Sequence, residues 1–183
     1  MTSFREPNRE EIYSKNSIEF LTVTNEFCKF LESIDKYRKA ETFTFLQRIL
    51  PLIYLKATLL PDVDIIDDTM DLSPLTEEEY NKINENLSTK FGKDDKYWDI
   101  DNQRNFVKED SIIQISLSEM LSDIYQETKN FVEIFQHGKS DAKQSILFQC
   151  RTNFENEWGN KLLSALKVIH SLSYFDIDVK IDV

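Results

Sequence analysis

The chain has 183 residues, of which 40% are hydrophobic and 30% charged, and its formal net charge is −11. This length suits one domain with a sizeable core. Only 3 glycines and 4 prolines are present, too few for the turns of an all-β fold or for a phosphate-binding loop. An acidic surface repels phosphate backbones and anionic lipid, so we expect neither nucleic acid nor a membrane as a partner.

The cysteine content and the hydropathy predict a cytoplasmic protein. Cys28 and Cys150 lack the spacing of a metal or redox pair, and both lie on apolar stripes where unreactive core thiols are usual. No apolar run reaches the ~20 residues that cross a bilayer. The first 15 residues are polar and charged, unlike a signal peptide.

The first half of the chain predicts two helices after a polar, frayed segment at residues 1–16. Apolar residues at three- and four-residue steps predict the first helix, from about Ser17 to Asp35. The run Phe43–Pro61 carries two apolar stripes, which predicts a central helix with a wide buried surface. Pro51 removes one backbone donor, so this helix is expected to kink or to break there.

An acidic insertion at residues 62–110 follows these helices. It holds 15 acidic and 6 basic side chains, which is most of the excess negative charge. Thr76 and Glu79 match a capping box and predict a third helix that ends near Lys90 or Gly92. Residues 93–110 mix charges with aromatic side chains and are expected to be irregular.

The second half predicts two longer helices and a strand. Asp110 or Ser111 is expected to cap the fourth helix, which ends before Gly138, and the fifth begins at Ser140 in an antiparallel hairpin. Gly159 costs about 1 kcal/mol within that fifth helix and indicates a kink or a close helix crossing. Residues 175–183 alternate apolar and polar side chains, which predicts a short C-terminal strand.

Four stretches of the sequence carry a family resemblance: Glu19–Glu32, Ile49–Pro61, Leu121–Gln126 and Trp158–His170. They span most of the chain, and they resemble an uncharacterised bacterial helical family known as domain of unknown function 5063. The resemblance implies an all-α fold. It implies no activity, since none is established for that family, and residues 175–183 lie outside the stretches that match.

Lys56 is the one charged residue on the second apolar stripe of the predicted central helix. A desolvated lysine there could act as a base or as a Schiff-base nucleophile. Its stem can instead lie on apolar surface while the ammonium pairs with an acid or reaches water, and this arrangement is favoured because buried unpaired lysines are rare. If a small-ligand pocket exists, we expect it around Tyr54, Lys56, Trp158 and Lys161.

No metal site or cofactor is expected from the acidic and histidine residues. The five aspartates between residues 62 and 71 lack the glycine and glutamate spacing of a calcium loop. Glu119, Asp123 and Glu127 share one helix face, which is expected to be the outer one. His137 and His170 lack the spacing of a zinc site, and a pairing of a cysteine with His170 stays open.

Two segments are candidates for binding a partner. An exposed Trp98, next to Tyr97, would indicate a binding surface, but the same pair could also pin its segment to the bundle. In the tail, apolar side chains would form one face of a strand that can add to the edge of a partner's sheet. These tail residues are Ile177, Val179 and Ile181.

The sequence thus predicts a single-domain, all-α bundle of about five helices with an acidic, irregular insertion and a short C-terminal strand. The leading hypothesis is a cytoplasmic protein-interaction or regulatory module, whose partner offers a basic surface to the acidic insertion. An enzyme or small-ligand binder with the pocket named above is the alternative, less favoured because no catalytic motif is present. A homodimer is compatible with either hypothesis.

Overall fold

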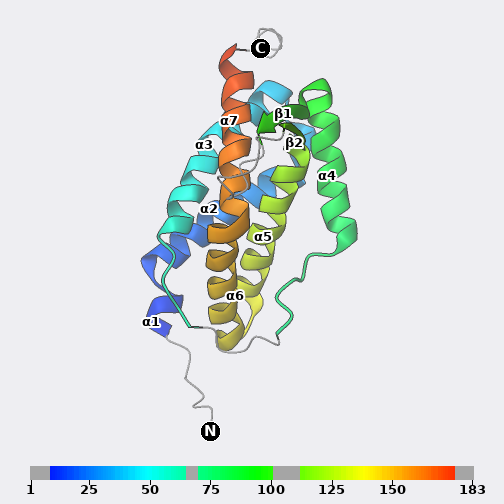
Figure 1. The fold of residues 1–183 in the computed structure, drawn as a ribbon. Helices are drawn as coiled ribbons and strands as arrows, with labels where there is room; N and C mark the ends of the chain where they lie inside the picture. The colour runs from blue at the N-terminus through cyan, green and yellow to red at the C-terminus, as the bar shows by residue number, and fades with distance from the viewer. Residues whose placement is uncertain (1–8, 65–69, 101–111, 176–183) are drawn as a thin grey trace.

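Helices make up most of the computed structural model, which describes residues 9–64, 70–100 and 112–175 (Figure 1). A single turn, α1, precedes a bundle in which α6 and α7 continue one another, so that five helical rods pack together as predicted. The helices are α1 (Arg9–Ile12), α2 (Lys15–Glu32), α3 (Lys39–Thr58), α4 (Glu77–Phe91), α5 (Leu117–His137), α6 (Ser140–Asn153) and α7 (Gly159–Phe175).

Aromatic pairs tie the rods together in the core. Phe20 of α2 meets Phe131 of α5 edge-on with ring centroids 4.9 Å apart. Phe43 of α3 stacks on Phe91 of α4 at 5.5 Å. Such pairs contribute about 0.5–1.5 kcal/mol each beyond the area that they bury. Ile12 of α1 is also fully buried, so the expectation of a frayed segment up to residue 16 is wrong for this turn.

Pro51 lies within α3 without ending it. The helix runs from Lys39 to Thr58, so the predicted break into two helices does not occur. The buried side of α3 carries Leu46, Leu50 and Ile53, and the proline ring lies on the exposed side. The missing amide donor is thus tolerated where the helix faces away from the core.

A π-helical turn, Phe154–Trp158, joins α6 to α7. The Trp158 indole is buried, donates from Nε1 to the Cys150 carbonyl oxygen at 3.2 Å, and meets the Phe154 ring edge-on. Gly159 follows this turn directly. A Cβ at Gly159 would lie 2.5 Å from the Phe154 carbonyl oxygen and 3.0 Å from its ring, so the close contact at this glycine is with the preceding π turn and not with a crossing helix.

The acidic insertion contains more regular structure than its composition indicates. The capping box of Thr76 and Glu79 opens α4 as predicted. Strand β1 (Lys96–Ile100) then pairs antiparallel with β2 (Ile112–Ser116), with Tyr97 opposite Ile115. The expectation of irregular structure is therefore wrong at β1.

The start of α5 also differs from the prediction. Ser116 caps this helix and Leu117 begins it, so Asp110 and Ser111 do not. The physical reason lies in Ile113 and Ile115, which are β-branched and alternate with a polar glutamine, the pattern of a half-buried strand.

The two strands form a ribbon beside the C-terminal half of α7 (Figure 1). Phe175, the first residue of the predicted C-terminal strand, is instead the last residue of α7. Ile177, Val179 and Ile181 lie outside the described residues. Among the helices that are described, none combines the length and the apolar character needed to cross a membrane.

Candidate functional site

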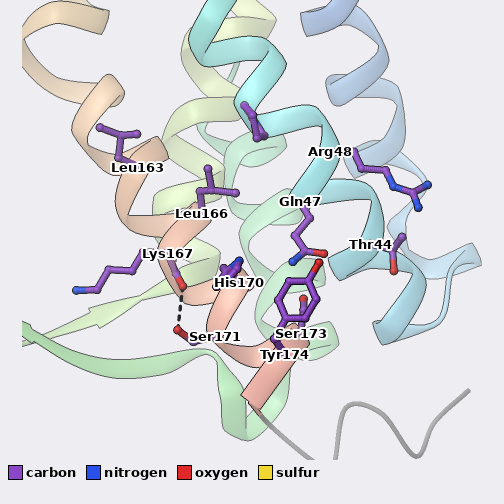
Figure 2. A pocket seen from close by; sticks show the side chains of 11 residues that line it. Thr44, Gln47, Arg48, Leu163, Leu166, Lys167, His170, Ser171, Ser173 and Tyr174 are labelled. Atoms are coloured by element: carbon purple, nitrogen blue, oxygen red, sulfur yellow. Dashed lines mark hydrogen bonds between the residues drawn. The ribbon is translucent and has the colours of Figure 1, made fainter.

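A groove of about 890 Å³ lies between α3 and α7, which run side by side in opposite directions (Figures 1 and 2). Their antiparallel packing brings the N-terminal half of α3 next to the C-terminal half of α7. The residues that line the groove are Thr44, Gln47, Arg48, Pro51, Leu163, Leu166, Lys167, His170, Ser171, Ser173 and Tyr174.

None of the described residues that line this groove is acidic, although the chain carries 33 Asp and Glu residues. Figure 2 shows Gln47 and Tyr174 in the space between the two helices, while Arg48 and Lys167 extend outward on opposite sides. The His170 ring lies 4.7 Å from that of Tyr174. The charged residues among those that line the groove are therefore basic, and they lie beside apolar ones such as Leu163 and Leu166.

Beyond Arg48, the solvent side of α3 becomes apolar. Leu52 and Leu55 of α3 are 45% and 51% exposed, and Leu59, which caps the C-terminus of this helix, is 42% exposed. Their three- and four-residue spacing places them on one side. Leu163 of α7 is exposed as well. We call this surface the α3–α7 face; it consists of the groove residues together with Leu52, Leu55 and Leu59.

The α3–α7 face corrects one expectation from the sequence. The second apolar stripe of α3 was expected to be buried, but its members Leu52 and Leu59 face solvent. The other members of this stripe are covered by the described part of the chain: Ile49 is buried, and Phe45 stacks on Phe30 of α2 with ring centroids 3.8 Å apart. That second stripe was the signal in the sequence that could have located the face.

The four residues of the predicted ligand pocket do not line this groove. Lys56 donates to Glu19 Oε2 at 2.6 Å, and Lys161 donates to Asp123 Oδ2 at 2.6 Å, so each ammonium is held by a different carboxylate. The pairing favoured for Lys56 is thus observed.

The two aromatic members of the predicted pocket pack in the core beside the π turn. The Tyr54 ring packs edge-on against Phe154 at 5.2 Å, and Phe154 separates it from the buried Trp158. The structure therefore brings Tyr54 and Trp158 together through Phe154. No contact described for the chain joins them to the two lysines.

A polar cluster lies where α5 meets α4, α6 and α7. Asp123 accepts hydrogen bonds from the Tyr80 hydroxyl at 2.7 Å and from Lys161, and Glu127 accepts one from the Asn153 amide at 3.0 Å. Asp123 and Glu127 are half-buried, so the expectation that they lie on the outer face is wrong. Glu119, the third residue of that stripe, is exposed as expected.

Glu127 has the most perturbed carboxyl of this cluster. Burial raises its pKa, the hydrogen bond from Asn153 opposes that rise, and the negative charges of Glu157 and Asp123 add to it. A raised pKa in the folded state means that ionisation of Glu127 disfavours folding. This cost is absent below the pKa of the unfolded chain, grows as the pH rises above that value, and is complete once the pH exceeds the folded pKa.

We therefore expect Glu127→Gln to raise the melting temperature at pH 7 by roughly 1 to 3 °C, because the amide needs no ionisation. The difference from the wild type should shrink as the pH falls and Glu127 becomes protonated. Thermal unfolding of both proteins between pH 7 and pH 4 measures this. A gain that stays constant over that range would show that the charge of Glu127 is not the cause.

The cysteines have no features of a nucleophile. Burial raises the pKa of the Cys28 thiol to about 12 and that of Cys150 well above its usual value. The Cys28 thiol lies 3.6 Å from the Thr128 hydroxyl. His170 contacts aromatic rings on its own helix, and none of its described contacts is with a cysteine. Both thiols are buried in the core, as expected.

Tyr97 and Trp98 take different roles on the ribbon. Tyr97 packs against the core, with its hydroxyl 3.5 Å from the Met120 sulfur, and so ties the ribbon to α5. Trp98 points to the other side and is 68% exposed. The pinning alternative therefore holds for Tyr97, and Trp98 is exposed, as the binding-surface alternative requires. Within the described ranges, no three His, Cys, Asp or Glu side chains are placed to hold a metal ion.

The fold and the face together define an all-α bundle protein with a small β-ribbon and an open groove between two antiparallel helices. The chain belongs to the family described as "Domain of unknown function (DUF5063)", whose sequence profile matches residues 11–175. It is also similar to the crystal structure of protein BF1032 from Bacteroides fragilis, with 34% identity and a TM-score of 0.80. That similarity covers 90% of this chain and 96% of the other. A search of curated proteins found no match.

Proposed function

We propose that this protein is an interaction module and that its α3–α7 face docks a helical segment of a partner protein. The observation that carries the proposal is the row of exposed leucines, Leu52, Leu55 and Leu59, on the solvent side of α3. A surface helix normally presents charged and polar side chains there. Apolar side chains grouped on one exposed helix face mark a contact surface more often than isolated ones do.

The spacing of these leucines suits a helix as the occupant. Residues that recur every three or four positions form a ridge, which packs into the groove of a second helix. α7 runs beside α3 and supplies Leu163 as the opposite wall. Burying the exposed parts of these four leucines would contribute roughly 3 to 5 kcal/mol before the cost of association is subtracted.

Charge complementarity favours a partner segment that also carries acidic residues. The groove that continues the leucine row holds Arg48, Lys167 and His170, and none of its described lining residues is acidic. Two separate predictions from the sequence stay open to test. One is that a partner's basic surface binds the acidic insertion, and the other is that the C-terminal tail adds to the edge of a partner's sheet. The small-ligand alternative is less well supported, since Lys56 and Lys161 are each paired with a carboxylate.

Selection from a displayed library of helix-forming peptides of about four turns tests the docking function. The full chain is expected to enrich peptides with apolar residues at three- and four-residue spacing and with Asp or Glu toward one end. Leu55→Asp should abolish their binding. Ile18→Asp is the matched control, because Ile18 is 42% exposed on α2, and it should bind like the wild type.

Three outcomes would contradict the proposal. If no peptide is enriched, the α3–α7 face is not a docking surface. The same conclusion follows if Leu55→Asp leaves the binding of the enriched peptides unaffected. A wild-type dimer that Leu55→Asp converts to a monomer, seen by sedimentation, would make a second copy of this chain the occupant and would replace the proposed partner.

A further inference from the structure

We infer that the polar half of the α3–α7 face is a carboxylate-binding subsite, which reads acidic residues at one end of the docked segment. This inference rests on the proposed docking function and says which end of the face binds the acidic end of the docked segment. The subsite consists of Arg48 and Gln47 from α3 with Lys167, His170 and Tyr174 from α7.

Arg48 is the central residue of the argument. It forms no ion pair with any residue that the structure describes, although acidic side chains are abundant in the chain. Arg38, by contrast, pairs with Glu41 at 3.2 Å, and Arg151 pairs with Asp62 and Glu155 at 3.1 Å. An arginine that remains unpaired beside a groove keeps its planar set of donors available for a carboxylate.

The surroundings of Arg48 favour an anion over other ligands. Lys167 and His170 add basic groups, and the Gln47 amide can donate a neutral hydrogen bond. Arg48 and Lys167 extend outward on opposite sides of the groove, as Figure 2 shows. A segment that lies along the groove therefore passes between two cations. Carboxylates on such a segment would meet positive charge on either side.

The order of residues along α3 determines at which end of the face the acidic residues of the docked segment bind. Arg48 precedes Leu55 by seven residues, which is about two helical turns or ~10 Å along the axis. The apolar contacts and the carboxylate contacts are thus at opposite ends of one surface. A helix that uses both must carry its acidic residues about two turns from its central apolar residue, and on the same side.

Three synthetic helical peptides test this assignment. All three peptides carry the same row of leucines. They differ only at the positions two helical turns from the central leucine, which are Glu in the first peptide, Gln in the second and Lys in the third. The affinities are measured by fluorescence anisotropy with the full chain at low salt. The Glu peptide should bind about ten-fold more tightly than the Gln peptide. The Lys peptide should bind more weakly than the Gln peptide. Added salt should bring the three affinities closer together, since it screens exposed charges.

Substitutions assign that preference to the subsite. The double variant Arg48→Gln and Lys167→Gln should reduce the affinity for the Glu peptide to that for the Gln peptide and leave the latter unchanged. Lys36→Gln with Lys82→Gln is the matched control; it removes the same charge from exposed positions elsewhere and should keep the preference for the Glu peptide.

Glutarate is tested alone, by NMR, because a free dicarboxylate offers the same chemistry. Shifts at Arg48 with glutarate, without a preference for the Glu peptide, would identify a small-molecule carboxylate as the ligand.

The carboxylate assignment is overturned if the double variant weakens the Glu and Gln peptides equally, or if the Lys peptide binds as tightly as the Glu peptide. It is also overturned if neither the peptides nor glutarate bind. In each case the library selection still decides the docking function independently, since that result depends on Leu55.

Discussion

Asp95→Ala is expected to lower the free energy of unfolding by about 3 kcal/mol. The Asp95 carboxylate is buried just before β1 and joins this strand to the N-terminus of α5. It accepts from the Ser118 amide at 2.7 Å, from the Ser118 hydroxyl at 3.0 Å and from the Ser116 hydroxyl at 3.1 Å. Alanine would leave the buried Ser118 amide without an acceptor and remove the acceptor shared by the two hydroxyls.

The position of Asp95 adds to this effect. A negative charge at the N-terminus of a helix is favoured by the helix dipole, and the Asp95 carbonyl oxygen also accepts from the Leu117 amide at 2.8 Å. Asp95→Asn keeps one acceptor oxygen and should cost about half as much as alanine, since hydrogen bonds to neutral groups are weaker.

Urea unfolding of the full chain measures these costs. Asp35→Ala is the control, because Asp35 is exposed and no hydrogen bond is described for its side chain, so its effect should stay within about 0.5 kcal/mol. Equal effects of Asp95→Ala and Asp35→Ala would show that the buried carboxylate does not hold the ribbon to α5.

Gly159→Ala is expected to destabilise the protein by about 2 kcal/mol, which is opposite to the effect that helix propensity alone predicts. In a regular helix the same change would be favourable by about 1 kcal/mol. Here the new methyl group would lie 2.5 Å from the Phe154 carbonyl oxygen and 3.0 Å from the Phe154 ring. The ring is fixed against Tyr54 and Trp158, so it cannot move away without disturbing the core.

Asn160→Ala separates packing from propensity in this experiment. Asn160 follows Gly159 on α7 but is exposed, so alanine there should be neutral or stabilising by about 0.5 kcal/mol. Thermal unfolding of both variants gives the comparison. A melting temperature of Gly159→Ala at or above that of the wild type would mean that the π turn relaxes into a regular helix at little cost.

The parts of the fold that depend on local sequence could be predicted. The capping box at Thr76 uses residues three positions apart, and the long helices follow from apolar spacing. The ribbon was missed although Ile113 and Ile115 carry a strand pattern, because each strand is only five residues long and 11 residues separate the two. The pairing of Lys56 was predictable as a type of contact, but its partner Glu19 was not.

The candidate face could be predicted only in part, because exposure is decided by tertiary packing. Periodicity identified two apolar stripes on α3 but not which of them a neighbouring helix covers. The same limit applies to Asp123, whose stripe resembled an outer face until α4 and α7 were seen to supply Tyr80 and Lys161. The groove needed the antiparallel arrangement of α3 and α7, which bring together residues more than a hundred positions apart.

The most direct test of the docking function is methyl NMR of the full chain during titration with the Glu peptide. We expect the largest shifts at Leu52, Leu55, Leu59 and Leu163, which form the apolar part of the α3–α7 face. Shifts concentrated at Ile113, which is exposed on the ribbon that carries Trp98, would contradict the account and would place the contact surface there.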